Sequence, residues 1–209
     1  MKKLIMLLSI AFLLQSCIEI KETITLNANG GGNIALLIDL GKIGKAINQQ
    51  SGTNFLDQIK KVPLEAKNLL KTNKGISNLQ TKADDDEGVY AISFDFKNSK
   101  ALNNAIYSLF NQKKLAVMPN IVKVSKHKLS RMNFAPFLKK YVAQDKGNMV
   151  SNMFYQYVNF ESIYNFPRAV KKVSNSKAKL ENDDKTVHLK YTLHDLLSTD
   201  FDYGISVRY

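Results

Sequence analysis

The chain has 209 residues and a formal charge of +12 at pH 7, because 30 lysines and arginines face 18 aspartates and glutamates. Its 44% hydrophobic content is enough for a packed core and excludes an intrinsically disordered protein. A single cysteine excludes an intramolecular disulfide. The basic excess favours anionic partners such as lipid headgroups, or else a solvated basic face, and we expect no nucleic-acid partner.

The first residues combine positive charge with a short apolar run. Lys2 and Lys3 precede the run from Leu4 to Leu14, which ends at Leu14-Gln15-Ser16-Cys17. This run is shorter than the ~20 apolar residues that a bilayer-spanning helix needs. The segment resembles the signal sequence of bacterial lipoproteins, in which an aliphatic residue and small residues precede a cysteine, although Gln15 departs from that pattern.

The lipoprotein resemblance implies cleavage after residue 16 and attachment of fatty acyl chains such as palmitate to Cys17. One acyl chain binds a bilayer only marginally, whereas two or three hold a protein firmly. An ordinary secretory signal with a chance cysteine is the alternative. We therefore expect a signal peptide at 1–16 and a lipid-anchored protein from residue 17 on.

Residues 18–40 give the clearest structural signal. Apolar residues alternate with polar ones on both sides of a glycine-rich stretch, Asn27-Ala28-Asn29-Gly30-Gly31-Gly32. Period-two alternation around such a turn predicts a hairpin with one buried face, which is typical of an antiparallel sheet. The hairpin begins directly after Cys17, so we expect the folded domain to lie close to the bilayer.

The middle of the chain alternates between helical and extended patterns. Residues 41–73 are predicted to be helical, in two pieces because Pro63 interrupts a regular helix. Residues 76–97 predict a second hairpin that turns at Asp84-Asp85-Asp86-Glu87, which we interpret as a solvated turn rather than a calcium loop. Asn98-Ser99 caps a further helix, and more strand is expected between 121 and 134.

An aromatic stretch begins at residue 153 and predicts a strand that ends before Pro167. Both of its faces carry rings, so one face is a candidate groove for an acyl chain or glycan; the alternative is a central strand buried on both faces. The candidate groove residues are Phe154, Tyr155, Tyr157, Phe160 and Tyr164. Alternation predicts three later strands, near 178–180, at 187–193 and at 203–209.

These patterns predict one α+β domain over residues 17–209, with an antiparallel sheet of several hairpins and helices packed on one face. We find no serine between the glycines that a nucleophile elbow requires, and no zinc spacing among His127, His188 and His194. His188 is expected to be solvent-exposed. His194 and Asp195 are expected on opposite faces of a strand, which suits no catalytic pair. We therefore expect no metal, no cofactor and no enzymatic activity.

Most of the chain after Cys17 is also faintly similar to LppM-type lipoprotein domains, on the early hairpin, Phe166-Pro167 and Lys185-Thr186-Val187. That resemblance implies an α+β domain with an apolar cavity for lipids or glycolipids. Our first hypothesis is a non-enzymatic envelope lipoprotein that binds a lipid, glycolipid or envelope protein through an apolar groove with a basic rim. We expect it at the outer membrane, because the residue directly after Cys17 is not an aspartate. The alternative is an assembly subunit that pairs with an envelope protein through a sheet edge.

Overall fold

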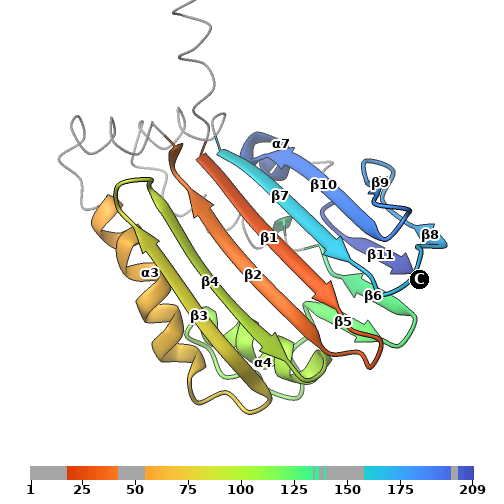
Figure 1. Cartoon of the computed structure of the whole chain (residues 1–209), viewed down its shortest axis with the longest axis horizontal. Coiled ribbons are helices and arrows are strands. Elements are labelled where there is room, and N and C mark those ends of the chain that lie inside the picture. The colour runs from red at the N-terminus through yellow and green to blue at the C-terminus, as the bar shows by residue number, and fades with distance from the viewer. Residues whose placement is uncertain (1–17, 42–54, 134, 137–138, 140–157, 199–201) are drawn as a thin grey trace, which may run out of the picture.

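A seven-stranded sheet forms the larger layer of the molecule (Figure 1). The computed structural model of the chain describes residues 18–41, 55–133, 135–136, 139, 158–198 and 202–209. The strand order of the large sheet is β3-β4-β2-β1-β7-β10-β9. These strands are β1 (Ile18–Leu26), β2 (Gly32–Asp39), β3 (Ile76–Asp84), β4 (Val89–Phe96), β7 (Val158–Asn165), β9 (Lys179–Glu181) and β10 (Thr186–Thr192).

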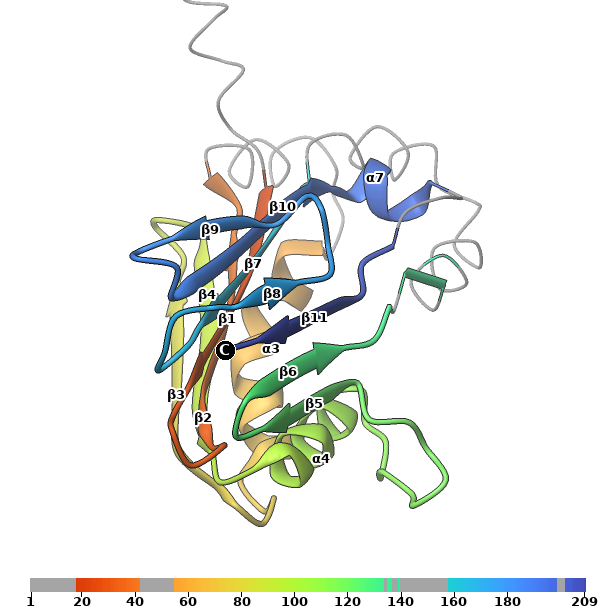
Figure 2. The ribbon, with the colours of Figure 1, turned by 90° about the vertical axis from the view of Figure 1, so that its right-hand side faces the viewer.

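The second layer contains helices and a smaller sheet on the same side of the large sheet (Figure 2). The four-stranded sheet has the order β5-β6-β11-β8. Its strands are β5 (Val122–Ser125), β6 (Lys128–Arg131), β8 (Lys172–Val173) and β11 (Ile205–Arg208), and the helices are α3 (Phe55–Leu70), α4 (Ser99–Leu109) and α7 (Leu193–Leu197). No described element covers the opposite face of the large sheet, which we call the outer face.

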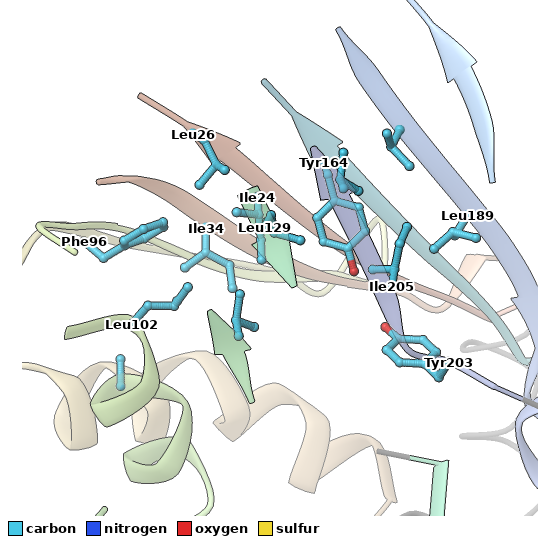
Figure 3. Close-up of a cluster of buried hydrophobic side chains, with 14 of the residues drawn as sticks. Ile24, Leu26, Ile34, Phe96, Leu102, Leu129, Tyr164, Leu189, Tyr203 and Ile205 are labelled. Atoms are coloured by element: carbon cyan, nitrogen blue, oxygen red, sulfur yellow. The ribbon is translucent and has the colours of Figure 1, made fainter. Parts of the chain in front are cut away.

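The core lies between the two layers. Tyr90, Ile92, Phe94 and Phe96 of β4 are buried while the residues between them are half-buried, as the alternation predicts. The labelled side chains of Figure 3 project from both sheets and from α4 into this one space. The predicted α+β class, with helices on one face of the sheet, is therefore confirmed.

The small sheet is attached to α4 by a buried amide. Asn103 is completely buried; its side-chain nitrogen donates to the Val122 carbonyl at 2.5 Å, and its side-chain oxygen accepts from the Val122 backbone at 3.2 Å. The Asn98 side chain caps the start of the same helix by accepting from the Ala101 backbone, as the sequence predicts. Helix α4 thus holds the β5–β6 hairpin over the large sheet.

The large sheet is not purely antiparallel. β1 pairs with β2 in the antiparallel sense, but it pairs with β7 in parallel. The expectation of an antiparallel sheet throughout is therefore wrong at this pair. Alternation identifies a strand and its buried face, but the partner of a strand far away in the sequence is set by tertiary packing.

Two local expectations are also wrong. Helix α3 continues through Pro63, whose ring is buried on the same face as Ala66 and Leu70, so packing offsets the lost backbone hydrogen bond. Residues 193–195 belong to α7 rather than to a strand, because Thr192 and Asp195 form a reciprocal capping box. In this capping box the Thr192 backbone N–H donates a hydrogen bond of 2.9 Å to the Asp195 carboxylate.

Replacing Leu129 by alanine tests where the core lies. Leu129 of β6 is fully buried, so we expect Leu129→Ala to lower the free energy of unfolding by about 2–5 kcal/mol. Leu64→Ala is the matched control, because Leu64 is 62% exposed on α3, and it should change stability by about 0.5 kcal/mol or less. Denaturant titration measures both, and equal losses would contradict this description of the core.

Candidate ligand site between the two sheets

An ion pair lies in the interior, between β1 of the large sheet and β6 of the small one. The Arg131 guanidinium contacts the Glu22 carboxylate, and the two side chains are only 8% and 14% exposed. The guanidinium also lies 4.7 Å from the centre of the Tyr203 ring and donates to the Tyr164 hydroxyl at 3.4 Å. The pair therefore joins the two sheets within an aromatic surrounding.

The charge of Arg131 is retained in this interior. Burial by itself would lower the pKa of Arg131, because it disfavours the charged form, but the Glu22 carboxylate together with the hydroxyls of Tyr203, Tyr164 and Tyr191 raises that pKa above its ordinary value. Replacing one partner would leave the other charge buried and uncompensated. Both side chains are therefore needed together.

Three tyrosine hydroxyls and one serine extend the polar cluster. The Ser162 hydroxyl lies 3.1 Å from that of Tyr191 and 2.9 Å from that of Tyr203, and the two rings meet edge-on with their centres 4.9 Å apart. Burial raises the pKa of Tyr164, Tyr191 and Tyr203. The phenols are therefore neutral at physiological pH, where they can donate hydrogen bonds to a polar group but cannot act as bases.

An apolar row crosses the inner face of the large sheet beside this cluster. Ile38, Ile20, Phe160 and Tyr191 are opposite one another in register on the neighbouring strands β2, β1, β7 and β10. Ile38, Ile20 and Phe160 are only half-buried although their strands are central, whereas Ile24, four residues along β1 from Ile20, is fully buried. The inner face of the sheet is therefore incompletely covered at Ile38, Ile20 and Phe160.

The structure places two of the five predicted groove residues in this region. Phe160 belongs to the row and stacks on Tyr191 with ring centres 6.5 Å apart, and Tyr164 is fully buried with its hydroxyl in the polar cluster. Phe154, Tyr155, Tyr157 and the predicted acylation site Cys17 lie outside the described residues.

Several residues of the site were not predicted from the sequence. Glu22 and Ser162 occupy the apolar parity of their strands, between Ile20 and Ile24 and between Phe160 and Tyr164. A charged or polar residue at such a position is a signal of a buried partner. Arg131 gives no comparable signal, because it lies in a lysine-rich stretch that is typical of a surface.

A second polar cluster lies on the outer face. Glu161 is 8% exposed; it forms an ion pair with Lys21 at 2.6 Å and lies 2.6 Å from His188, whose other ring nitrogen is 3.1 Å from Glu181. The expectation that His188 is simply solvent-exposed is therefore wrong, because its side chain is 21% exposed and bound on both sides. In the described part of the chain, no three histidine, cysteine or carboxylate side chains are arranged to hold a metal ion.

A hollow of about 560 Å³ opens at the end of the large sheet where the β1–β2 turn approaches the start of β3. Its lining includes Asp95, which accepts from Asn33 at 2.8 Å and from Asn78 at 2.6 Å, and these bonds lower the pKa of Asp95. Its mixed polar lining suits an acyl chain less well than the apolar row does. Asp95 is already satisfied by two amides, so we place the candidate site at the row and the polar cluster.

Comparisons with known proteins give a distant structural likeness. No known protein family matches the sequence, and no curated protein matches it either. Among solved structures, the folded domain of LppM from Mycobacterium tuberculosis aligns over 92% of this chain and 90% of that domain, with 11% identity and a TM-score of 0.42. This likeness does not show that the chain belongs to that family. None of the described helices has the length and apolar character needed to cross a bilayer.

Removing one partner of the buried ion pair should destabilise the protein more than removing both. We expect Arg131→Met to lower the free energy of unfolding by about 3–5 kcal/mol, because Glu22 is left buried without its counter-charge. The double variant Glu22→Leu/Arg131→Met should lose less than Arg131→Met alone, because no buried charge is left uncompensated. A double-mutant cycle measures this coupling, and strictly additive losses would contradict a direct buried pair.

The outer-face pair Lys21–Glu161 should make stability depend on pH. Burial would raise the pKa of Glu161, but Lys21 and His188 outweigh it and lower that pKa, while the Glu161 hydrogen bond raises the pKa of Lys21. The contribution of this pair to the free energy of unfolding is therefore complete above the ordinary glutamate pKa of ~4.3 and is lost as the pH falls through the lowered pKa of Glu161. It is lost again as the pH rises above the ordinary lysine pKa of ~10.4.

We expect Glu161→Gln to lower the free energy of unfolding by about 1–2 kcal/mol at neutral pH, with the difference from the parent shrinking below about pH 4. Glu181→Gln is the control, because Glu181 contacts the same histidine but its side chain is 47% exposed. Denaturant titrations at several pH values measure both. A Glu161→Gln loss that stays constant into acid would show that charge is not responsible.

Proposed function

We propose that the chain is a non-enzymatic lipoprotein, anchored at the cell envelope through acylated Cys17, that binds a lipid or glycolipid between its two sheets. The observation that carries this proposal is the half-buried apolar row of Ile38, Ile20 and Phe160, directly beside buried hydroxyl groups. An amphiphile needs an apolar wall and a small number of placed polar groups, and this region provides both.

The chemistry of the polar cluster favours a hydroxyl-bearing head group. Arg131 is balanced by Glu22, so that together they add no net charge to the interior. The hydroxyls of Ser162, Tyr191 and Tyr203 bond to one another and can exchange those bonds for bonds to a ligand. A sugar or polyol head would therefore lie at the hydroxyls while its acyl chain lies along the row.

The start of the large sheet supports the anchoring part of the proposal. β1 begins at Ile18, which follows the predicted acylation site directly. An acylated Cys17 would therefore hold the domain near the bilayer, where lipid ligands are present. The outer membrane is the proposed location, because the residue directly after Cys17 is Ile18 and not an aspartate.

Pairing through a sheet edge is the second candidate. β3 is a nine-residue edge strand of the large sheet, but it has an irregular register between Ser77 and Gln80 and carries Lys82 on its outer side. Bulges and lysines are devices that prevent edge pairing. The structure thus gives this alternative less support than the interior site.

The test compares substitutions of two adjacent residues, Leu37 and Ile38, which lie on opposite faces of β2. The parent chain, purified from membranes, is extracted with organic solvent, and bound lipid is identified by mass spectrometry. We expect Ile38→Gln to lose most of the bound lipid, because a polar side chain then interrupts the row, while Leu37→Gln on the outer face retains it. Circular dichroism confirms that both variants are folded.

Two outcomes would overturn the proposed function. The first is a folded parent chain that carries no lipid. The second is retention of lipid by folded Ile38→Gln at the level of the parent.

A further inference from the structure

The loop between α4 and β5, residues 110–121, carries an unusual concentration of exposed apolar side chains. Phe110 is 67% exposed, Leu115 is 52% exposed and Val117 is 90% exposed. They make up half of the large apolar side chains that are exposed in the described part of the chain; the others are Val62, Leu64 and Leu180. Figure 2 shows this loop projecting from the side of α4 and β5, away from the large sheet.

The base of the loop is firmly held. The Tyr107 hydroxyl donates to the Pro119 carbonyl at 3.0 Å, and Asn103 fixes Val122 directly after the loop. Within the loop, the Met118 backbone donates to the Leu115 carbonyl at 3.1 Å, which closes a turn. The apolar residues are therefore presented by a closed, supported turn, and their exposure does not come from a loose chain end.

Basic residues surround these apolar side chains. Lys113 and Lys114 lie between Phe110 and Leu115, and the sequence contains no aspartate or glutamate between Asp95 and Asp145. That acid-free stretch also supplies Lys123, Lys126 and Lys128 on the neighbouring β5–β6 hairpin. At the end of α4, the Ser108 hydroxyl donates to Asn73, which lies between Lys71 and Lys74.

From this combination we infer that the α4–β5 loop docks on the surface of an anionic lipid bilayer. Exposed apolar side chains that are clustered mark interaction sites, whereas scattered ones are ordinary. Phe110, Leu115 and Val117 enter the boundary between headgroups and acyl chains, and the lysines contact the anionic headgroups. This inference does not depend on the ligand site between the sheets.

The experiment places an environment-sensitive fluorophore on the loop of the full chain. Cys17 is the single cysteine, so Cys17→Ser/Val117→Cys provides one thiol for labelling on the loop. Cys17→Ser/Leu64→Cys is the matched control, because Leu64 is an exposed leucine on α3. Each labelled chain is mixed with vesicles of phosphatidylglycerol and phosphatidylcholine, or of phosphatidylcholine alone, with or without a quencher on the acyl chains.

We expect the probe at position 117 to shift its emission to shorter wavelength and to be quenched from within the anionic vesicles, while the probe at position 64 changes little. Any affinity of residues 1–17 for membranes is common to both chains, so that only the difference between the two positions reports on the loop.

A second variant tests the charges. Each lysine near an anionic surface contributes about a fivefold gain in affinity, so Lys113→Gln/Lys114→Gln should raise the vesicle concentration for half-maximal change at position 117 by about 25-fold. Lys171→Gln/Lys172→Gln is the control, because it neutralises another neighbouring pair, at β8 on the far edge of the small sheet.

Several results would overturn the inference. These are an unchanged probe at position 117 with anionic vesicles, an equal change at position 64, or an equal change with phosphatidylcholine alone. A probe at position 117 that is already shielded before vesicles are added would show that the protein itself or a second copy covers the loop, and would overturn it too.

Discussion

The pairing of Glu22 with Arg131 is the constraint on which the arrangement of the two layers depends. The Glu22 carboxylate lies on the inner face of β1 and contacts the Arg131 guanidinium on β6, so that the pair joins the two sheets. Buried ion pairs often contribute little net stability, because desolvation offsets the attraction. We interpret this pair as fixing where the small sheet lies over the large one, and with it the positions of Tyr164 and Tyr203.

Local patterns predicted much of the fold and little of the site. Alternation identified the 18–40 hairpin, the buried face of β4 and the last strand, because each of these is encoded by neighbouring residues. The parallel pairing of β1 with β7 could not be predicted in this way, since it joins distant segments. The site depends on that pairing, because it brings Ile20 beside Phe160 and Glu22 beside Ser162.

The two faces of the large sheet suit different tasks. The outer face carries a charged network in which Glu161 contacts Lys21 and His188 on the neighbouring strands. The inner face combines the apolar row with neutral hydroxyl groups. The inner face therefore combines the apolar and polar groups that the proposed amphiphilic ligand would need.

The most direct measurement is a nuclear Overhauser experiment on the full chain, purified from membranes with its lipid and labelled at isoleucine methyl groups. We expect cross-peaks between acyl-chain protons and the methyl groups of Ile20 and Ile38, and none to Ile163 on the outer face. Cross-peaks from Ile20 and Ile38 to protons of the protein alone, in a sample that retains lipid, would contradict it.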